Sequence, residues 1–175
     1  MSEALPSSPA AQLCTDLRAV RARYDKLPRG DIAVLRRCRT AEEIAVEGIY
    51  WHIGGPLAQR QRHLSHVVLL FPLAPQSASD RFSFGRFLSR ELGDTDGAKL
   101  RFRRLLASRD RQELDHRMMA ILRLACADKA PVDWGALGKD ILWFLSESGD
   151  TRRRWAQDFY APTSDLPAAT SVPHA

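Results

Sequence analysis

The chain has 175 residues and a mass of 19.7 kDa, enough for one domain or for two small ones that share an interface. Its 45% of hydrophobic and 27% of charged residues, with ten glycines and ten prolines, exclude a fibrous repeat and a wholly disordered chain. Lysine and arginine outnumber aspartate and glutamate by 26 to 21. Arginine supplies 22 of these basic residues, and its planar guanidinium suits phosphates and stacks on bases. A GC-rich genome also favours arginine codons, so only the positions of the arginines along the chain can distinguish nucleic-acid binding from codon bias.

No targeting or membrane segment is expected. Residues 1–11 have neither a basic start nor an apolar run, and the longest apolar stretch, 67–73, is far shorter than the roughly 20 residues that span a bilayer. Cys14, Cys38 and Cys126 are odd in number and far apart, which fits neither a disulfide framework nor a zinc motif. We therefore expect a reduced, cytoplasmic protein without a metal or cofactor.

The N-terminal region predicts a succession of short helices. Apolar residues recur at helical spacing over 13–24, and Pro28 ends that pattern. A glycine and an aspartate at 30–31 predict a turn and a cap before a helix over 32–38. Thr40 predicts another cap, because the two glutamates that follow suit the positive end of a helix dipole.

The middle of the chain predicts the centre of the fold. A Gly-Gly-Pro break at 54–56 precedes a helix predicted over 57–73, whose second half is apolar on every side and is expected to be buried. The polar segment 76–80 is the best candidate for a hinge. It would separate an N-terminal helical part, residues 10–75, from a C-terminal helical part, residues 82–161.

The C-terminal part predicts five more helices, ending in a disordered polar tail over 163–175. Leu114, Met118, Ile121 and Ala125 lie on the clearest amphipathic stripe. No segment alternates with a two-residue period, so we predict an all-α fold of two packed helical subdomains without a sheet. The predicted helices cover 84–92, 98–108 and 114–125 and follow Asp133 and Gly149, with Trp134, Trp143 and Trp155 in the core.

Basic residues are concentrated in one window. Residues 99–111 hold six basic side chains against Asp110 alone, a net charge of +5 that equals the charge of the whole chain. On a helix Arg104 lies opposite Phe102, so the helix would have a basic face toward solvent and an apolar face toward the core. Like charges at this density repel each other, which favours phosphate binding. Five neutralised phosphates of a single strand would make log K fall against log salt with a slope of roughly −3.5.

Smaller basic clusters have acids close by. The three arginines at 152–154 lie near Glu147 and Asp150, so we expect a solvated, charge-balanced face. The arginines within 36–39 precede three glutamates, which leaves phosphate binding and local pairing both open. Isolated candidates are Arg60, Arg62 and Arg123.

Catalytic and metal sites have weaker support. His63 and His66 are three residues apart without a visible third ligand, so they are expected at the surface or at the edge of the core. Asp94 and Asp96 resemble half of an acidic metal loop, although flanking glycines favour a plain turn. No glycine-rich phosphate loop and no nucleophile motif occurs. For Trp51 the sequence leaves two roles open, stacking on a base and packing within the fold.

Six short pieces occur in the order found in a known family. On these pieces the chain resembles the CasB family, the small subunit of the type I-E CRISPR surveillance complex called Cascade. Phe84 departs from the family by standing where its S-L-G element has leucine. Together the pieces extend over about residues 16–160, and they are Gly30–Arg37, Val68–Ala74, Phe82–Leu88, Arg101–Ala107, Val132–Trp134 and Trp155–Tyr160.

The resemblance implies an all-helical subunit without catalytic activity. Two copies would lie head to tail against the backbone subunits that hold the guide RNA, in a complex that also contains a large subunit. Their basic surface would hold the hybrid of guide RNA and target DNA and the displaced single strand, and so stabilise the R-loop. No membrane partner is implied.

The resemblance also assigns individual residues. Arg37 matches the second arginine of the family's L-R-R element, and Arg123 matches an arginine on the helix after the basic one. Arg60 or Arg62 matches an arginine before the apolar helix, and Lys139 is a further match. The expected nucleic-acid-binding residues are Arg36, Arg37, Arg60, Arg62, Arg86, Arg101, Arg103, Arg104, Arg109, Arg111, Arg123 and Lys139.

Two other functions stay open at this point. A free-standing helix-turn-helix regulator would use two helices between Gly93 and Arg117, but the chain lacks asparagine, the usual reader of adenine. A metal-dependent nuclease would use Asp94, Asp96 and a histidine.

Overall fold

The computed structural model describes residues 8–77 and 83–161, and every regular element within them is a helix. The one β-type pairing in these ranges is an isolated bridge between Gln76 and Val132, which confirms the all-α prediction. The predicted tail over 163–175 and most of the predicted hinge lie outside the described residues. The elements are α1 Pro9–Asp25, α2 Arg29–Arg37, α3 Ala41–Val46, α4 Gly48–Gly54, α5 Pro56–Arg60, α6 Leu64–Leu70, η1 Phe71–Leu73, α7 Phe84–Leu92, α8 Asp96–Leu106, α9 Arg111–Ala125, α10 Trp134–Trp143 and α11 Asp150–Tyr160.

Helices α3 and α10 begin at the predicted caps, Thr40 and Asp133. The Thr40 hydroxyl accepts a hydrogen bond from the Glu43 N–H at 3.2 Å, as expected for the start of α3. The predicted cap at 30–31 is wrong, because α2 already begins at Arg29 with Pro28 at the capping position. Pro28 has the φ of −55° that its ring imposes, which suits entry into a helix. None of the helices described is long and apolar enough to cross a membrane.

The helix predicted over 57–73 is wrong as a single element. The chain leaves helical geometry at Gln61, with φ −114° and ψ 85°, and α6 starts at Leu64. Every residue of α6 is buried, whereas Arg60 and Arg62 are exposed. An uninterrupted extension of the buried helix would draw these two charges toward the core, and the break lets them reach solvent.

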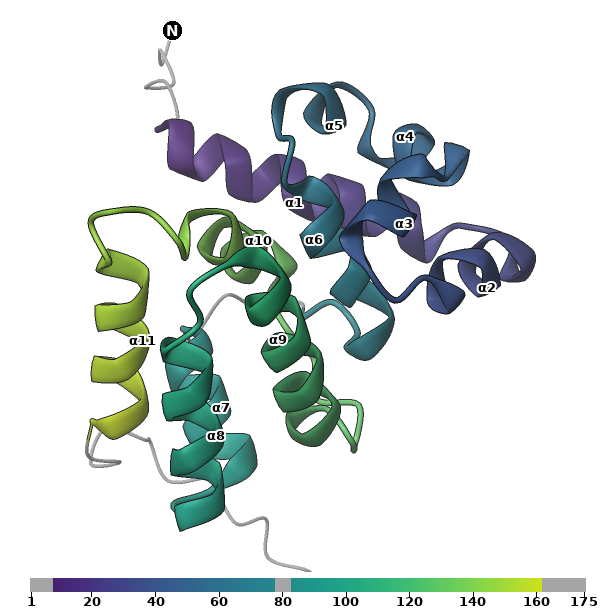
Figure 1. Ribbon diagram of the computed structural model, residues 1–175. Coiled ribbons are helices and arrows are strands. Elements are labelled where there is room, and N and C mark those ends of the chain that lie inside the picture. The colour runs from purple at the N-terminus through teal and green to yellow at the C-terminus, as the bar shows by residue number, and fades with distance from the viewer. Residues whose placement is uncertain (1–7, 78–82, 162–175) are drawn as a thin grey trace, which may run out of the picture.

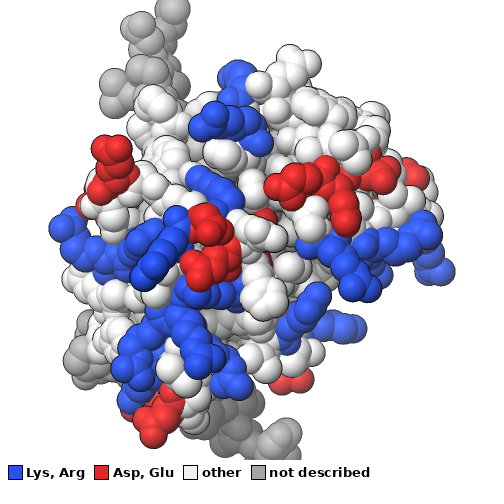
Figure 2. All heavy atoms as spheres, in the orientation of Figure 1, with Lys and Arg blue, Asp and Glu red and all other residues white. Residues whose placement is uncertain are grey.

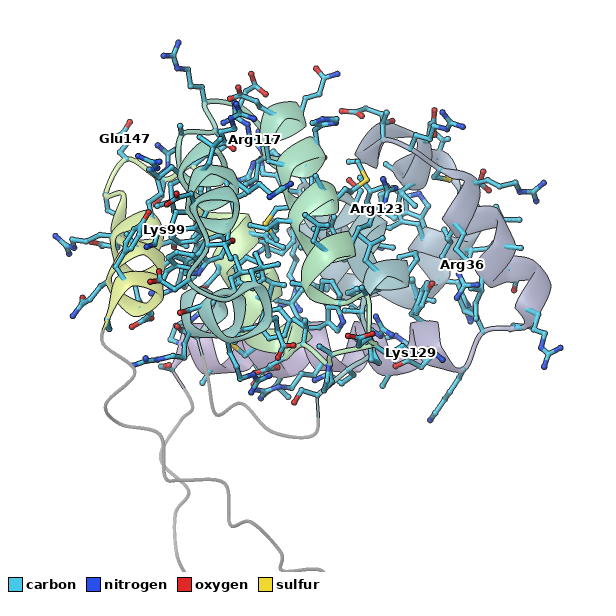
Figure 3. The ribbon with its side chains drawn as sticks, turned by 90° about the horizontal axis from the view of Figure 1, so that it is seen from below. Arg36, Lys99, Arg117, Arg123, Lys129 and Glu147 are labelled. Atoms are coloured by element: carbon cyan, nitrogen blue, oxygen red, sulfur yellow. The ribbon has the colours of Figure 1, made fainter. Side chains whose placement is uncertain are left out.

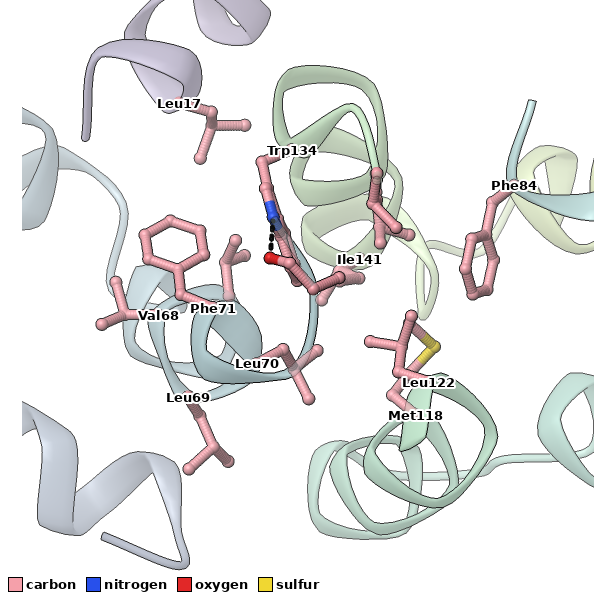
Figure 4. Packing of buried hydrophobic residues seen from close by; sticks show 14 of the residues in the cluster. Leu17, Val68, Leu69, Leu70, Phe71, Phe84, Met118, Leu122, Trp134 and Ile141 are labelled. Carbon is pink, nitrogen blue, oxygen red and sulfur yellow. Dashed lines mark hydrogen bonds between the residues drawn. The ribbon is translucent and has the colours of Figure 1, made fainter. Parts of the chain in front are cut away.

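Helix α6 and the turn η1 lie at the centre of the core. Figure 4 shows Phe71 beside Trp134, and Leu70 on the side that faces Leu122 of α9. The ring of Phe71 meets that of Trp134 edge to face, with 5.1 Å between the centroids. The buried indole N–H of Trp134 donates to the Ala74 carbonyl at 3.1 Å, so its polar atom has a partner.

Helix α10 packs against α1, across the two predicted parts (Figure 1). A Cβ atom at Gly135 would lie 2.7 Å from a backbone carbonyl oxygen of α1, so glycine permits this close approach. Arg18 Nε and Nη2 donate to the two carboxylate oxygens of Asp133 at 2.9 and 2.7 Å. Burial alone would raise the pKa of Asp133, but Arg18 and nearby backbone N–H groups outweigh it, and the pKa is lowered.

Helices α7, α8 and α11 form the lower left of the molecule in Figure 1. A Cβ atom at Gly85 would lie 2.2 Å from the Trp155 carbonyl oxygen, so α7 and α11 are in backbone contact. Phe102 of α8 stacks on Phe159 of α11 with 4.0 Å between ring centroids. The predicted inward position of Phe102 is therefore confirmed, and this contact packs the buried face of α8 against α11.

The tryptophans divide between core and surface. Trp134 and Trp155 are fully buried, as predicted. The core position predicted for Trp143 is wrong: it ends α10, its side chain is 44% exposed, and the Lys139 ammonium lies 5.6 Å from its ring centroid. Trp51 is 48% exposed, and its indole N–H donates to a backbone carbonyl of α3.

Candidate nucleic-acid interface

Helix α8 presents arginines above a buried face. The Thr95 hydroxyl caps the helix by accepting from the Ala98 N–H at 3.1 Å, while Phe102 and Leu105 are completely buried. Residues at the positions between these apolar ones face solvent. The α8 arginine surface, as we define it, consists of four exposed residues: Arg101, Arg103, Arg104 and Arg109.

Within the described residues, the guanidinium groups of this surface make no hydrogen bond and no ion pair. Two acids close in sequence have other partners. Asp94 pairs with Lys99 at 2.6 Å, and Asp110 caps α9 by accepting from the Glu113 N–H at 2.8 Å. The positive charge of the α8 arginine surface is therefore not neutralised by these neighbours.

The arginines of α11 are used differently. Arg153 pairs with Asp150 at 2.8 Å, which confirms the predicted balanced face. Arg154 pairs with the buried Asp140 of α10 at 2.5 Å, and Arg152 donates to a carbonyl at the end of α8 at 2.8 Å. All three guanidinium groups thus have partners within the chain.

Arg111 is part of the packing between α9 and α10. It is the first residue of α9, and its Nη1 and Nη2 atoms donate to the carbonyls of Ile141 and Leu142 at 2.6 and 2.7 Å. The last carbonyls of a helix lack partners within it, so Arg111 caps the end of α10. Burial lowers the pKa of its guanidinium. Arg111 therefore does not belong to the α8 arginine surface.

Helix α9 forms the second wall of a groove beside α8. Arg117, which was not among the predicted residues, donates to the Arg104 carbonyl and to the Glu113 carboxylate. It lies one turn before Ile121, at the edge of the apolar stripe, and this spacing is the signal that could have placed it there. The groove is lined by Arg101, Arg104, His116, Arg117, Ala120 and Ile121.

Basic side chains extend beyond α8. Figure 2 shows them gathered at the lower left and again toward α2 at the right, with acidic side chains between. In Figure 3, Arg123 of α9 lies between Arg117 and Arg36. Arg36 lines a groove together with Tyr24 and Lys129, so basic residues of α2 and of the turn after α9 meet there.

Arg37 faces a different groove from Arg36. Its Nε donates to the carbonyl of residue 33 at 3.2 Å, and the groove also holds Glu43 and Glu47. Local acids thus lie close to Arg37, unlike the residues of the α8 arginine surface.

The remaining predicted residues lie on other elements. Arg60 pairs with Asp16 at 3.6 Å, and Arg62 donates to His63 at 3.2 Å. Arg86 is half-buried on α7. Lys139 of α10 lies 3.9 Å from the carboxylate of the residue that follows it. The structure does not bring these four residues onto the α8 surface.

An acidic groove lies on the other side of α9. Glu42 of α3 lines it together with Asp110, Glu113 and Asp115 of α9 and its cap. His66 was expected at the surface or core edge, but it is buried, with Nδ1 2.6 Å from a carboxylate oxygen of Asp115. Burial raises the pKa of Asp115. No group of three or more metal-ligating side chains occurs in residues 8–77 or 83–161.

The fold and this surface define an all-helical protein in which four exposed arginines, on and just after α8, have no guanidinium partner among the described residues. The family model described as CRISPR-associated protein Cse2 matches residues 31–160, most of the chain. The chain therefore belongs to the Cse2 family, also called CasB, which supplies the small subunit of type I-E Cascade. Comparison with curated proteins and with solved structures gives no match. Membership of this family favours a subunit of a CRISPR complex over a free-standing helix-turn-helix regulator.

Proposed function

We propose that this Cascade subunit holds opened DNA through the α8 arginine surface and thereby stabilises the R-loop. The observation that carries the proposal is a set of four exposed guanidinium groups, on and just after α8, that have no partner among the described residues. Arginines at this density repel one another, and phosphates relieve that repulsion. Because Phe102 packs α8 against α11, the arginines are already held on an ordered helix. DNA binding would not have to offset the conformational entropy lost on ordering a loop.

The physics of R-loops suits such a surface. Opening DNA against a guide RNA exchanges one duplex for another of similar stability, and protein contacts to the backbone tip the balance. Contacts to phosphates carry no sequence information, as this task requires. In the proposal the subunit acts without catalysis, beside the backbone and large subunits and a second copy of itself, on the guide–target hybrid and the displaced strand.

The lifetime of the R-loop in the reconstituted complex tests this proposal. Replacing Arg101→Ala together with Arg104→Ala should shorten the lifetime several-fold while assembly of the complex is unchanged. Arg153→Ala is the matched control for Arg104→Ala, because it removes one exposed arginine that already has an acidic partner. An unchanged lifetime in the double variant would refute the proposal.

A further inference from the structure

The groove between α8 and α9 combines an apolar floor with cationic walls. Ala120 and the edge of Ile121 form the floor. Arg101 and Arg104 stand on the α8 side, and Arg117 stands on the α9 side. Its volume of about 330 Å³ is at the lower end of the roughly 300–1,000 Å³ typical of small-molecule sites. A groove of this size and lining has room for one flat ring.

The walls hold two kinds of arginine. Both terminal nitrogens of Arg117 are occupied, one by the Arg104 carbonyl and one by Glu113, and its side chain is 26% exposed. A guanidinium held by two partners is not available to a phosphate, but Arg117 lines the groove and a planar guanidinium can stack on a ring. The guanidinium groups of Arg101 and Arg104 have no partner among the described residues and are free to contact phosphate.

We infer that this groove seats one unstacked base of a single DNA strand, an inference that rests on the proposed function. The base lies on the floor at Ala120, beside the Arg117 guanidinium and the exposed His116 ring. Arg101 and Arg104 contact the adjoining phosphates. Bases of a duplex stay stacked inside it and cannot enter, so the groove selects the displaced single strand over the guide–target hybrid.

The test is photocrosslinking in the assembled complex, with iodouracil in place of thymine along the displaced strand. Crosslinks should map to the segment from Arg101 to Ile121. Ala120→Gln fills the floor without changing charge and should lower the crosslink yield about tenfold, the effect of losing one stacked base. Ala19→Gln is the matched control, because Ala19 is also an exposed alanine within a helix, on α1.

Two results would overturn the inference: crosslinks that map elsewhere or are absent, or a yield that Ala120→Gln leaves unchanged. The R-loop lifetime of the Arg101→Ala, Arg104→Ala variant separates this failure from that of the proposed function. A shortened lifetime without groove crosslinks would refute only the base seat. An unchanged lifetime without crosslinks would refute both.

Discussion

Helices α8 and α11 each carry three arginines within one turn or so, and they lie in the same region of the molecule (Figure 1). On α11 the arginines bind Asp150, Asp140 and a carbonyl at the end of α8. On α8 the described residues offer Arg101, Arg103 and Arg104 no such partner. A run of arginines therefore indicates a ligand only when the acids around it are already committed elsewhere.

One buried carboxylate accounts for part of this difference. Asp140 of α10 is 5% exposed and accepts from Arg154 at 2.5 Å and from the Trp155 indole N–H at 2.8 Å. It ties the polar side of α11 to α10 while Trp155 fills the core. The buried face of α8 carries Phe102 and Leu105, and no described residue pairs with the guanidinium groups of Arg101, Arg103 and Arg104.

The largest expected effect comes from removing this carboxylate. Asp140→Ala leaves a buried indole N–H and a guanidinium without an acceptor, and should lower the free energy of unfolding by about 3–5 kcal/mol. Urea unfolding of the full chain measures it. Asp140→Asn keeps a hydrogen-bond acceptor and should cost less. A loss below about 1 kcal/mol for Asp140→Ala would show that α11 does not depend on this contact.

Arg109 and Arg111 give a sharper version of the same comparison, because they are two residues apart. Arg111→Ala uncaps the carbonyls at the end of α10 and should cost about 1–3 kcal/mol of unfolding free energy. Arg109→Ala removes an exposed guanidinium that has no partner among the described residues, and should change the free energy of unfolding by less than about 0.5 kcal/mol. Equal losses in urea unfolding would contradict the division between structural and available arginines.

A smaller effect is expected in the pH dependence of stability, because the ion pair of Arg18 with Asp133 titrates whereas Arg104 has no acidic partner among the described residues. Because Arg18 and backbone N–H groups lower the pKa of Asp133 in the folded protein, its contribution to stability is complete above the ordinary aspartate pKa of about 3.9. It is lost as the pH falls through the lowered value. Asp133→Asn should therefore flatten the dependence of the urea midpoint on pH below about 5. Arg104→Ala serves as the control and should leave this dependence unchanged; an equal slope in wild type and Asp133→Asn would count against the pair.

Sequence patterns predicted the features that depend on neighbouring residues. The caps at Thr40 and Asp133, the inward face of α9 and the stacking side of α8 at Phe102 all follow from spacing within one helix. The break at 61–63 does not follow from spacing, because it depends on how deeply α6 is buried.

The partners of the charged residues also could not be predicted from sequence where they are distant along the chain. The density of arginines over 99–111 indicated the α8 surface, but density alone cannot tell Arg109 from Arg111. Arg111 binds carbonyls 30 residues away in sequence, and Arg154 binds an acid 14 residues away. The spacing of Arg117 before Ile121 marks the edge of the apolar stripe, but its hydrogen bond to the Arg104 carbonyl depends on how α8 and α9 pack.

The salt dependence of DNA binding by the assembled complex tests the central claim most directly. If Arg101 and Arg104 each neutralise a phosphate of a single strand, the slope of log K against log salt should be shallower by about 1.4 in the double alanine variant than in wild type. Arg153→Ala should keep the wild-type slope. Equal slopes for wild type and the double variant would contradict the claim that the α8 arginines are available to DNA.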